Sequence, residues 1–346
     1  MQKSSGGLIH LNNFNAESNL ATYEHSFLTP THFIRGRVPP AEIELDDYKL
    51  TVSGQTRKKL VLTYDELMKL PSKEVVATME CAGNGRSEMK DKEGRNPPGE
   101  QWGRFAVSTA TWTGIPLSIL LKEAGLCDSA VEILFEGSDI GHIDDSGNQI
   151  SFERSLPREK ALDDVILAYK MNDHILPSEH GFPLRLVVPG WYGMAWTRSV
   201  KRIEAIDYNF NGFYQKERYV YVKENCEVKP VTTMHVNSVI TSAKLDASKG
   251  SHLLRGRAWS GEGKGYIVEV HVSIDGGLHW SPAQLIGPNE RYAWRSWQYH
   301  HILKPGEHTI SCMAIDSEGN MQPQEVEYNK FGYGNNAVQR LSLLVE

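Results

Sequence analysis

The residues best suited to chemistry lie in segment 75–86, which reads Val-Val-Ala-Thr-Met-Glu-Cys-Ala-Gly-Asn-Gly-Arg. Its first half predicts a strand, and Cys81 stands where that strand runs into a Gly-Asn-Gly turn. Glycines let the backbone pass close to a bound group, and the turn leaves the sulfur exposed at the strand end. A thiolate suits a sulfur-loving metal. The same residues also fit a hairpin turn beside a packed cysteine, and the pattern alone leaves both interpretations open.

Two other regions supply cationic side chains that an anionic ligand needs. His180 and Arg185 flank the start of an apolar strand, and Trp196-Thr-Arg198 follows on a loop. Arg35 and Arg37 stand two residues apart in an extended stretch, so they lie on the same side of the chain. Paired arginines favour an anionic ligand. The alternative interpretation is that the histidine is hydrogen-bonded within the protein and that the arginines are solvated on the surface.

Other metal and redox motifs are absent from the sequence. The four cysteines, at 81, 127, 226 and 312, never form Cys-x-x-Cys, which excludes a zinc ribbon, a thioredoxin-like pair and a dense disulfide scaffold. The 13 histidines include no His-Glu-x-x-His, so a zinc hydrolase is unsupported. The glycine-rich segment 261–265 lies between predicted strands, so it predicts a hairpin turn rather than a phosphate loop.

The composition is that of a globular protein, with 346 residues, 40% hydrophobic, 23% charged and a formal net charge of −6. Because no basic tract is present, we expect neither a nucleic-acid partner nor a membrane-surface partner. No apolar run approaches the roughly 18 residues that span a bilayer. No signal peptide is visible, so we expect a cytoplasmic protein, or a periplasmic one if a leader was removed.

A chain of this length favours two domains, and the composition changes near residue 230, so we expect domains 1–230 and 231–346. In the first domain, short apolar strands alternate with helical patterns. Thr63, with Glu66 three residues later, predicts a helix N-terminus. We also expect a helix at 115–124, strands at 131–135, 165–169 and 184–188, and irregular segments at 82–103 and 137–164.

After residue 230 the pattern is almost purely β. Residues 268–274 alternate between apolar and polar side chains and predict a strand, 275–277 predict a turn, and 278–285 predict the returning strand. Further strands are expected at 294–302 and 308–315. Regular short strands over about 110 residues suggest an immunoglobulin-like sandwich. We expect most of Trp259, Trp280, Trp294 and Trp297 to fill its core.

Together these segments resemble the sulfite oxidase family of molybdopterin enzymes, over nearly the whole chain. The resemblance implies an α+β fold class: a mixed α+β molybdopterin-binding domain followed by an all-β immunoglobulin-like sandwich domain that makes a homodimer. It also implies one Mo-molybdopterin cofactor per chain. The matching motifs are Met-Glu-Cys-Ala-Gly-Asn-Gly-Arg at 79–86, Ala-Val-Ser-Thr-Ala-Thr-Trp-Thr-Gly at 106–114, Leu-Ala-Tyr-Lys-Met-Asn at 167–172, His-Gly-Phe-Pro-Leu-Arg-Leu-Val-Val-Pro-Gly at 180–190 and Val-Ser-Ile-Asp-Gly-Gly-Leu-His-Trp at 272–280.

The resemblance also implies a role for each matching residue. Cys81 would be the protein thiolate on molybdenum, beside the dithiolene of one molybdopterin. Contacts to the pterin and its phosphate would come from Phe33, Arg37, Asp139, His180, Arg185, Trp196, Thr197 and Arg198. The substrate pocket would hold Arg35, Trp102 and Tyr219, with Arg86 behind them holding the cysteine loop. Such charge-assisted donors suit a small oxyanion in a dry pocket.

Three positions depart from the pattern of the family. Arg37 stands where many members have a histidine, and Arg198 replaces the usual lysine of the pterin loop. Phe331 occupies the position where animal sulfite oxidases place a second substrate arginine. Losing that charge weakens the case for a tightly held dianion.

The resemblance implies oxidation of sulfite to sulfate by oxygen-atom transfer at the cysteine-ligated molybdenum. The sequence has no Cys-x-x-Cys-His and no fused cytochrome b5 domain, so we expect no haem in the chain and an external electron acceptor. The acidic balance would suit a basic acceptor such as a cytochrome c. Two alternatives stay open: the same cofactor acting on sulfane sulfur, nitrate or a sulfoxide, and a non-catalytic binding protein on the same scaffold.

Overall fold

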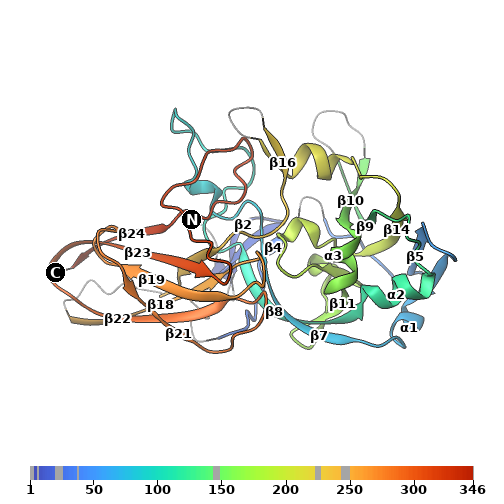
Figure 1. Cartoon of the computed structure of the whole chain (residues 1–346), viewed down its shortest axis with the longest axis horizontal. Coiled ribbons are helices and arrows are strands. Elements are labelled where there is room, and N and C mark those ends of the chain that lie inside the picture. The colour runs from blue at the N-terminus through green and yellow to red at the C-terminus, as the bar shows by residue number, and fades with distance from the viewer. Residues whose placement is uncertain are drawn as a thin grey trace.

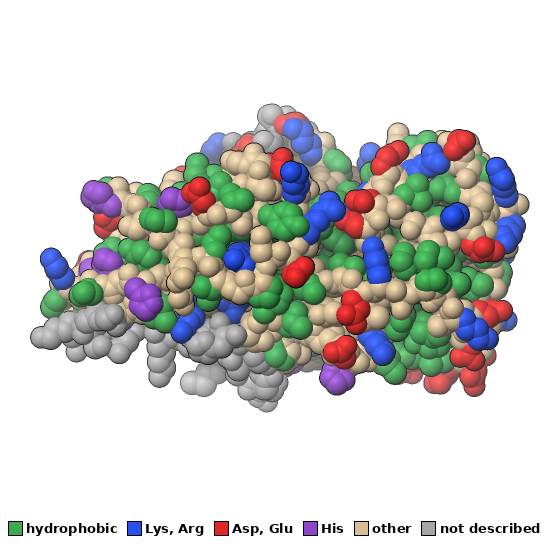
Figure 2. Space-filling view, turned by 60° about the horizontal axis from the view of Figure 1, so that its bottom comes forward, with side chains coloured by type: hydrophobic (Ala, Val, Ile, Leu, Met, Phe, Trp, Pro, Cys, Tyr) green, Lys and Arg blue, Asp and Glu red, His purple; other side chains and the backbone are tan. Residues whose placement is uncertain are grey.

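The computed structural model describes residues 4–5, 8–19, 26–36, 39–142, 149–222, 227–242 and 250–345. Figure 1 shows two neighbouring groups of strands, with β17 to β24 at one end and β5, β9, β10 and β14 at the other. Strands β7 and β8 run between these groups (Figure 1). On the face that Figure 2 shows, acidic and basic side chains are interspersed.

The sheet farthest from the C-terminal strands has five members in the order β10-β9-β14-β5-β6. Only the β14–β5 pair is parallel. Its strands are β5 (Lys49–Gly54), β6 (Leu60–Thr63), β9 (Glu132–His142), β10 (Gln149–Pro157) and β14 (Val200–Ile206).

A second sheet delivers the cysteine turn. Its order is β12-β11-β8-β7, and β13 pairs with β11. The strands are β7 (Lys73–Glu80), β8 (Val107–Pro116), β11 (Ile166–Met171), β12 (His174–Ile175) and β13 (Arg185–Val187). A small N-terminal sheet comprises β1 (Ser4–Ser5), β2 (Leu8–Asn12), β3 (Asn15–Ser18) and β4 (Ile34–Arg35).

Helices in the described ranges are few and short. The capping box predicted at Thr63 is confirmed, because its hydroxyl accepts the main-chain N–H of Glu66 while the Glu66 carboxylate accepts that of Thr63. The helices are α1 (Tyr64–Leu67), α2 (Leu117–Ala124) and α3 (Arg158–Asp163), with 3-10 turns η2 (Arg86–Glu88), η3 (Ser178–His180) and η4 (Gly193–Ala195) and the π-helix η5 (Tyr214–Arg218). None of the helices described is long and apolar enough to cross a membrane.

The C-terminal part consists of two four-stranded antiparallel sheets that share one core. Trp297 and Leu254 from the first sheet cluster with Ile310 and Val270 from the second. The first sheet contains β17 (Asn237–Ile240), β18 (Gly250–Trp259), β22 (Arg295–Leu303) and β21 (Gln284–Ile286); the second contains β20 (Ser281–Pro282), β19 (Ile267–Ser273), β23 (Gly306–Asp316) and β24 (Gln339–Val345). A short pair, β15 (Val220–Val222) and β16 (Val228–Pro230), connects the two parts.

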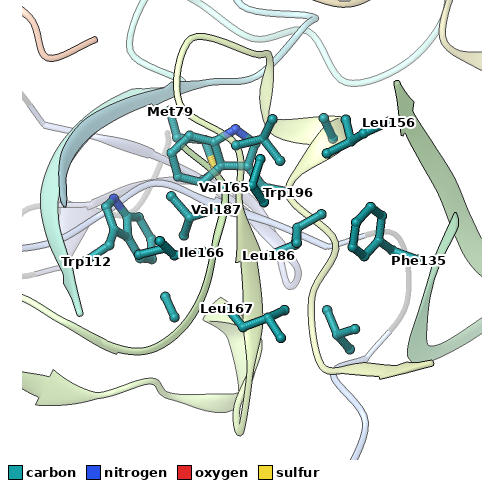
Figure 3. Packing of buried hydrophobic residues seen from close by; sticks show 14 of the residues in the cluster. Met79, Trp112, Phe135, Leu156, Val165, Ile166, Leu167, Leu186, Val187 and Trp196 are labelled. Carbon is teal, nitrogen blue, oxygen red and sulfur yellow. The ribbon is translucent and has the colours of Figure 1, made fainter. Parts of the chain in front are cut away.

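The larger hydrophobic core lies between the cysteine-bearing sheet and the five-stranded sheet. Figure 3 shows Leu186 and Val187 of β13 between Trp112 of β8 and Phe135 of β9. All four side chains are fully buried, which explains why this strand reads as a continuous apolar run. The same cluster continues past residue 230, where Trp259 and others join it.

The structure corrects three expectations about elements. It is mostly sheet, so the mixed α+β expectation overstated the helices. Segment 137–164 is not irregular, because β9, β10 and α3 occupy most of it; the antiparallel pairing of β9 with β10 outweighs the Gly, Ser and Asp content of those strands. The return strand expected at 278–285 is split, with β20 and β21 in different sheets.

Other expectations about elements agree with the structure. Strands β11, β13, β19, β22 and β23 lie where apolar runs predicted them, and α2 starts two residues inside the predicted helix, after Pro116. Trp259, Trp294 and Trp297 are buried, but of these only Trp297 lies in the core of the C-terminal sheets. Trp259 and Trp294 belong to the larger core instead, so the prediction that most of the tryptophans fill the sandwich core was wrong. Cys226 lies outside the described residues, and Cys81, Cys127 and Cys312 are free thiols.

Gly256 of β18 tests the packing of the C-terminal sheets. An added Cβ there would lie 2.1 Å from the Trp297 ring and 2.2 Å from the Val239 carbonyl oxygen. We expect Gly256→Ala to destabilise the protein by on the order of 1–3 kcal/mol, because overpacking forces buried groups to move. Thermal unfolding would measure this.

Gly319→Ala is the control for this substitution. Gly319 has a φ of +84° but no atom within 4 Å of an added Cβ, so only the backbone penalty of about 1 kcal/mol applies. Equal effects of the two substitutions would contradict the packing argument.

Candidate active site

A pocket with about 830 Å³ of empty space opens beside Cys81. Eight of the residues predicted from the sequence line it, from segments more than 180 residues apart: Phe33, Arg35, Cys81, Asp139, Arg185, Trp196, Arg198 and Tyr219. Four others, Arg86, Trp102, His180 and Thr197, are buried without being among the lining residues. Arg37 lies outside the described residues.

The backbone holds Cys81 at the end of β7. Its N–H donates to the Ala106 carbonyl oxygen at 2.9 Å, and its own carbonyl accepts the Asn84 N–H at 2.9 Å. Gly85 has a φ of +75°, which favours glycine. Gly83 makes room for the Arg86 guanidinium, since an added Cβ would lie 2.3 Å from its nearest nitrogen. These glycines therefore let another group come close to the backbone of the cysteine loop, as the sequence suggested.

Arg86 fastens the cysteine loop to two distant segments. Its Nε donates to the Phe331 carbonyl oxygen at 2.9 Å, and a terminal nitrogen donates to the Glu100 carbonyl oxygen at 2.7 Å. The guanidinium also lies 5.2 Å from the centre of the Tyr333 ring. This placement is behind the pocket wall, as expected for a residue that holds the loop.

Glu80, which precedes Cys81, is a buried carboxylate that the sequence interpretation missed. It accepts hydrogen bonds from Asn84 Nδ2 at 2.9 Å, Trp259 Nε1 at 2.9 Å and Asn237 Nδ2 at 3.2 Å. Burial raises its pKa to about 7, and these donors counter part of that cost. Two of the donors belong to β17 and β18, so the cysteine strand is held by the C-terminal sheet.

Two effects of the surroundings on the pKa of the Cys81 thiol oppose one another. Burial raises the pKa of the thiol, while the positive charges of Arg35 and Arg86 lower it. Arg35 is held on the wall by bonds from one guanidinium nitrogen to Asn15 Oδ1 at 3.0 Å and to the Gly36 carbonyl oxygen at 2.6 Å. The two arginines therefore favour the thiolate form of Cys81 against the cost of its burial.

Arg185 is a deeply buried cation that also lines the pocket. One terminal nitrogen donates to the His180 carbonyl oxygen at 3.0 Å, while its Nε has no hydrogen-bond partner. Burial and the neighbouring charge of Arg198 lower its pKa to about 9, so it stays protonated at neutral pH. In the described part of the chain no carboxylate is within ion-pair distance of Arg185, so the wall presents a positive charge to a ligand.

Arg198 and its neighbours complete this wall. Its Nε and a terminal nitrogen donate to Asp139 Oδ2 at 2.9 and 2.7 Å, and another nitrogen donates to the Glu179 carbonyl oxygen. On either side, the buried hydroxyls of Thr197 and Ser199 have no partner. Buried polar atoms are almost always satisfied, so these orphaned hydroxyls indicate a polar group that binds here.

Two buried histidines lie under the same wall. The rings of His32 and His180 are 5.4 Å apart in an edge-to-face arrangement. Burial lowers both pKa values, that of His32 to about 3, so both rings are neutral at physiological pH. His180 was predicted and His32 was not, because nothing in its sequence neighbourhood marks it as buried.

Tyr219 follows the π-helix η5, lines the pocket and packs in a row of aromatic rings. Its ring centre lies 5.5 Å from that of Tyr333, which lies 5.9 Å from that of Phe331. Single-turn π-helices are frequent at functional sites. Phe331, the position expected to lack a positive charge, packs against Arg218 and Lys330, each 5.4 Å from its ring centre.

Trp102 is fully buried, and its Nε1 has no partner. Next to it, the Glu17 carboxylate packs on Gly103, where an added Cβ would lie 3.2 Å from both of its oxygens. Burial raises the pKa of Glu17 to about 7, although main-chain groups of Gly103 and Phe105 lower it in part. Glu17 was not predicted, because its partners lie some 85 residues away along the chain.

Comparison with known proteins gives two family matches and several relatives. Residues 35–214 match the oxidoreductase molybdopterin binding domain, and residues 228–346 match the Mo-co oxidoreductase dimerisation domain. Mitochondrial sulfite oxidase of Mus musculus is 35% identical over 359 residues, covering 96% of this chain and 64% of that protein. NADH nitrate reductase of Solanum lycopersicum is 30% identical over 379 residues, covering 96% of this chain and 40% of that protein.

A solved structure is also similar. The sulfane dehydrogenase SoxCD of Paracoccus pantotrophus aligns with a TM-score of 0.83 and 29% identity, over 99% of this chain and 88% of that chain. The chain spans a little under two thirds of the length of the mouse, rat and human sulfite oxidases it matches.

Glu17 gives a pH-dependent prediction. Its pKa in the folded protein, about 7, lies above the ordinary 4.5, so the folded state binds the proton more tightly than the unfolded state. The stability that this provides below pH 4.5 is lost as the pH rises through 7. We therefore expect Glu17→Gln to raise the thermal midpoint at pH 8 and to give no gain at pH 4.5.

Glu325→Gln, at an exposed carboxylate, is the matched control and should show no such pH dependence. Thermal midpoints from pH 4.5 to 8 would measure both variants. A Glu17→Gln midpoint that runs parallel to the unsubstituted protein across this range would refute the assignment of a buried, protonated Glu17.

Proposed function

The chain belongs to the sulfite oxidase family of molybdopterin-dependent oxidoreductases, and we propose that it oxidises sulfite to sulfate. In this reaction sulfite and water give sulfate, two protons and two electrons, and the electrons pass to an external acceptor. The observation that carries the proposal is the pocket wall itself. Cys81, Arg35 and Tyr219 face one pocket, so a sulfur ligand for a metal lies beside donors for an oxyanion.

The pocket residues fit a molybdopterin cofactor. Arg185 Nε and the hydroxyls of Thr197 and Ser199 are buried donors without partners, which suits a pterin and its phosphate. Trp196, Asp139 and Arg198 complete that wall, with His180 beneath it. No three His, Cys, Asp or Glu side chains gather as a metal site in the described ranges, so Cys81 would supply one sulfur and the cofactor the others.

The bound molybdenum centre would supply the oxygen-atom transfer and accept the two electrons. The protein's own residues bind and orient the substrate. Arg35 and Tyr219 would donate to the sulfite oxygens, while Trp102 would support the wall by packing against Phe33, with ring centres 6.4 Å apart. Charge-assisted donors in a dry pocket hold a small oxyanion strongly. Arg86 acts through the loop that carries Cys81, so it is a positioning residue.

A second candidate substrate is sulfane sulfur. The structural similarity to the sulfane dehydrogenase SoxCD supports it, and so does Phe331, which is uncharged where the family resemblance places a second substrate arginine. Turnover of purified, molybdenum-loaded protein with sulfite and with a persulfide, using the same artificial electron acceptor, would separate the two. Sulfite turnover far above persulfide turnover supports the proposal.

We also propose a homodimer formed through the C-terminal sheets. The match to a dimerisation domain supports it, and so do the large apolar side chains exposed there, Val268, Leu278, Ile302 and Leu344. Light scattering should give twice the mass of one chain.

We further propose an electron acceptor of basic charge, such as a cytochrome c, which suits the net charge of −6 of this chain. The rate of sulfite oxidation with that acceptor should fall as the ionic strength rises, because salt screens the attraction between the two proteins.

Replacing Cys81 by serine tests the proposed metal ligand. We expect Cys81→Ser to fold, because the volume and the hydrogen bonds of the turn are retained, and to lose at least about 100-fold in sulfite-dependent dye reduction, as expected when a first ligand is lost. Cys127→Ser, at the other half-buried thiol, should keep full activity. Undiminished sulfite turnover by Cys81→Ser would contradict the assignment of Cys81 as the metal ligand.

A further inference from the structure

We infer that Arg154 is a specificity-determining residue: a buried cation beneath Tyr219 that makes this pocket favour anions. The inference deepens the proposed function, since it names the charge class of the substrate. Nothing in the sequence pattern or the family resemblance pointed to Arg154. It stands in β10, two residues after Phe152, which lines the pocket.

The contacts of Arg154 leave its charge uncompensated. The residue is only 1% exposed to solvent. Its guanidinium donates to the Tyr214 carbonyl oxygen and, at 3.4 Å, to the Val231 carbonyl oxygen, while its Nε has no partner. Carbonyl oxygens satisfy hydrogen bonds but do not cancel a formal charge.

An ion pair can neutralise a buried arginine in this protein, since the buried Arg104 pairs with Glu88 at 2.5 Å. Arg185 is a second buried arginine that lacks such a pair in the described part of the chain. Arg154 forms no such ion pair among the residues described. The carboxylate that acts on it, Glu132, is held by the Ser155 hydroxyl at 2.6 Å and the Phe210 N–H at 2.9 Å.

Burial lowers the pKa of Arg154 only to about 10, so the guanidinium is charged at neutral pH. A buried charge without a counter-ion is costly, and an anion bound nearby offsets that cost. The binding of an anion is therefore favoured over that of a neutral molecule of the same shape.

One aromatic layer separates this charge from the pocket. The guanidinium carbon lies 5.8 Å from the centre of the Tyr219 ring, and both Tyr219 and Tyr214 line the pocket. A cation over the ring stabilises electron density that builds up on the phenol oxygen, so it strengthens Tyr219 as a donor to an anion. Arg154 thus supplies, from β10, a positive charge beside Tyr219 that the uncharged Phe331 does not supply.

Arg154 also fixes the backbone around Tyr219. It ties the start of η5, through the Tyr214 carbonyl, to Val231, whose N–H donates to the Tyr219 carbonyl oxygen at 3.0 Å. The experiment must therefore separate the effect of charge from the effect of position.

The test compares Arg154→Met, which removes the charge, with Arg154→Lys, which keeps it. For molybdenum-loaded protein we expect Arg154→Met to raise the dissociation constant of sulfate, measured by calorimetry, and the KM for sulfite. Each should rise on the order of tenfold, the effect of one charge over roughly 10 Å at an effective dielectric near 20. Arg154→Lys should stay within about threefold of the unsubstituted protein, because its charge is retained.

Arg158→Met is the matched control, since Arg158 pairs with the exposed Asp128 and should affect neither constant. Molybdenum content shows that each variant is folded. If kcat falls in both Arg154 variants while sulfate affinity and KM stay unchanged, Arg154 only positions Tyr219 and the inference is overturned.

The sulfate measurement also separates this inference from the proposed function. A protein that turns over no sulfite, yet loses sulfate affinity in Arg154→Met, would refute the sulfite proposal and uphold the role of Arg154. Sulfate affinity that is equal in all four proteins would overturn the role of Arg154, whatever the sulfite activity is.

Discussion

The buried carboxylate of Glu80 is the constraint on which the site depends. A carboxylate removed from water is costly unless hydrogen-bond donors surround it. Here the donors are Asn84 of the cysteine loop and Asn237 and Trp259 of the C-terminal sheet. The carboxylate is satisfied only when the loop and that sheet are both in place. The position of Cys81, one residue later, is therefore set jointly by both parts of the chain.

The loop is braced from the C-terminal segment as well. Asn335 Nδ2 donates to the Gly85 carbonyl oxygen at 2.7 Å, and the Gly334 N–H donates to the Ala82 carbonyl oxygen at 2.8 Å. Arg86 adds its bond to the Phe331 carbonyl oxygen. The C-terminal region thus helps to fix the geometry around the Cys81 sulfur, in addition to any role in dimer formation. The hydrophobic core that continues across residue 230 also couples this region to the site.

The sequence predicted the parts of the site that have a local signature. Cys81 on its glycine turn, Arg35 on an extended stretch and Arg185 at a strand start line one pocket. Glu80, His32 and Arg154 were not predicted, because what distinguishes them is burial among partners far away in the chain. The bonds from Glu80 to Asn237 and Trp259 span 157 and 179 residues, and no periodicity in one sequence reveals such pairs. The expectation that segment 137–164 is irregular was wrong for a different reason, since the pairing of β9 with β10 makes much of it sheet despite its turn-forming residues.

The distribution of cations reconciles the net charge of −6 with an anionic substrate. Of the arginines that line the pocket, Arg198 is paired with Asp139, whereas Arg35 and Arg185 have no ion pair within the described residues. A charge in a dry pocket acts at a low effective dielectric, while the acidic side chains on the surface are screened by water and salt. The local field at Cys81 is therefore set by a few buried guanidinium groups. Because Phe331 carries no charge, we expect the anion selectivity of the pocket to depend on Arg35 and Arg185, which line it, and on Arg154 beneath Tyr219.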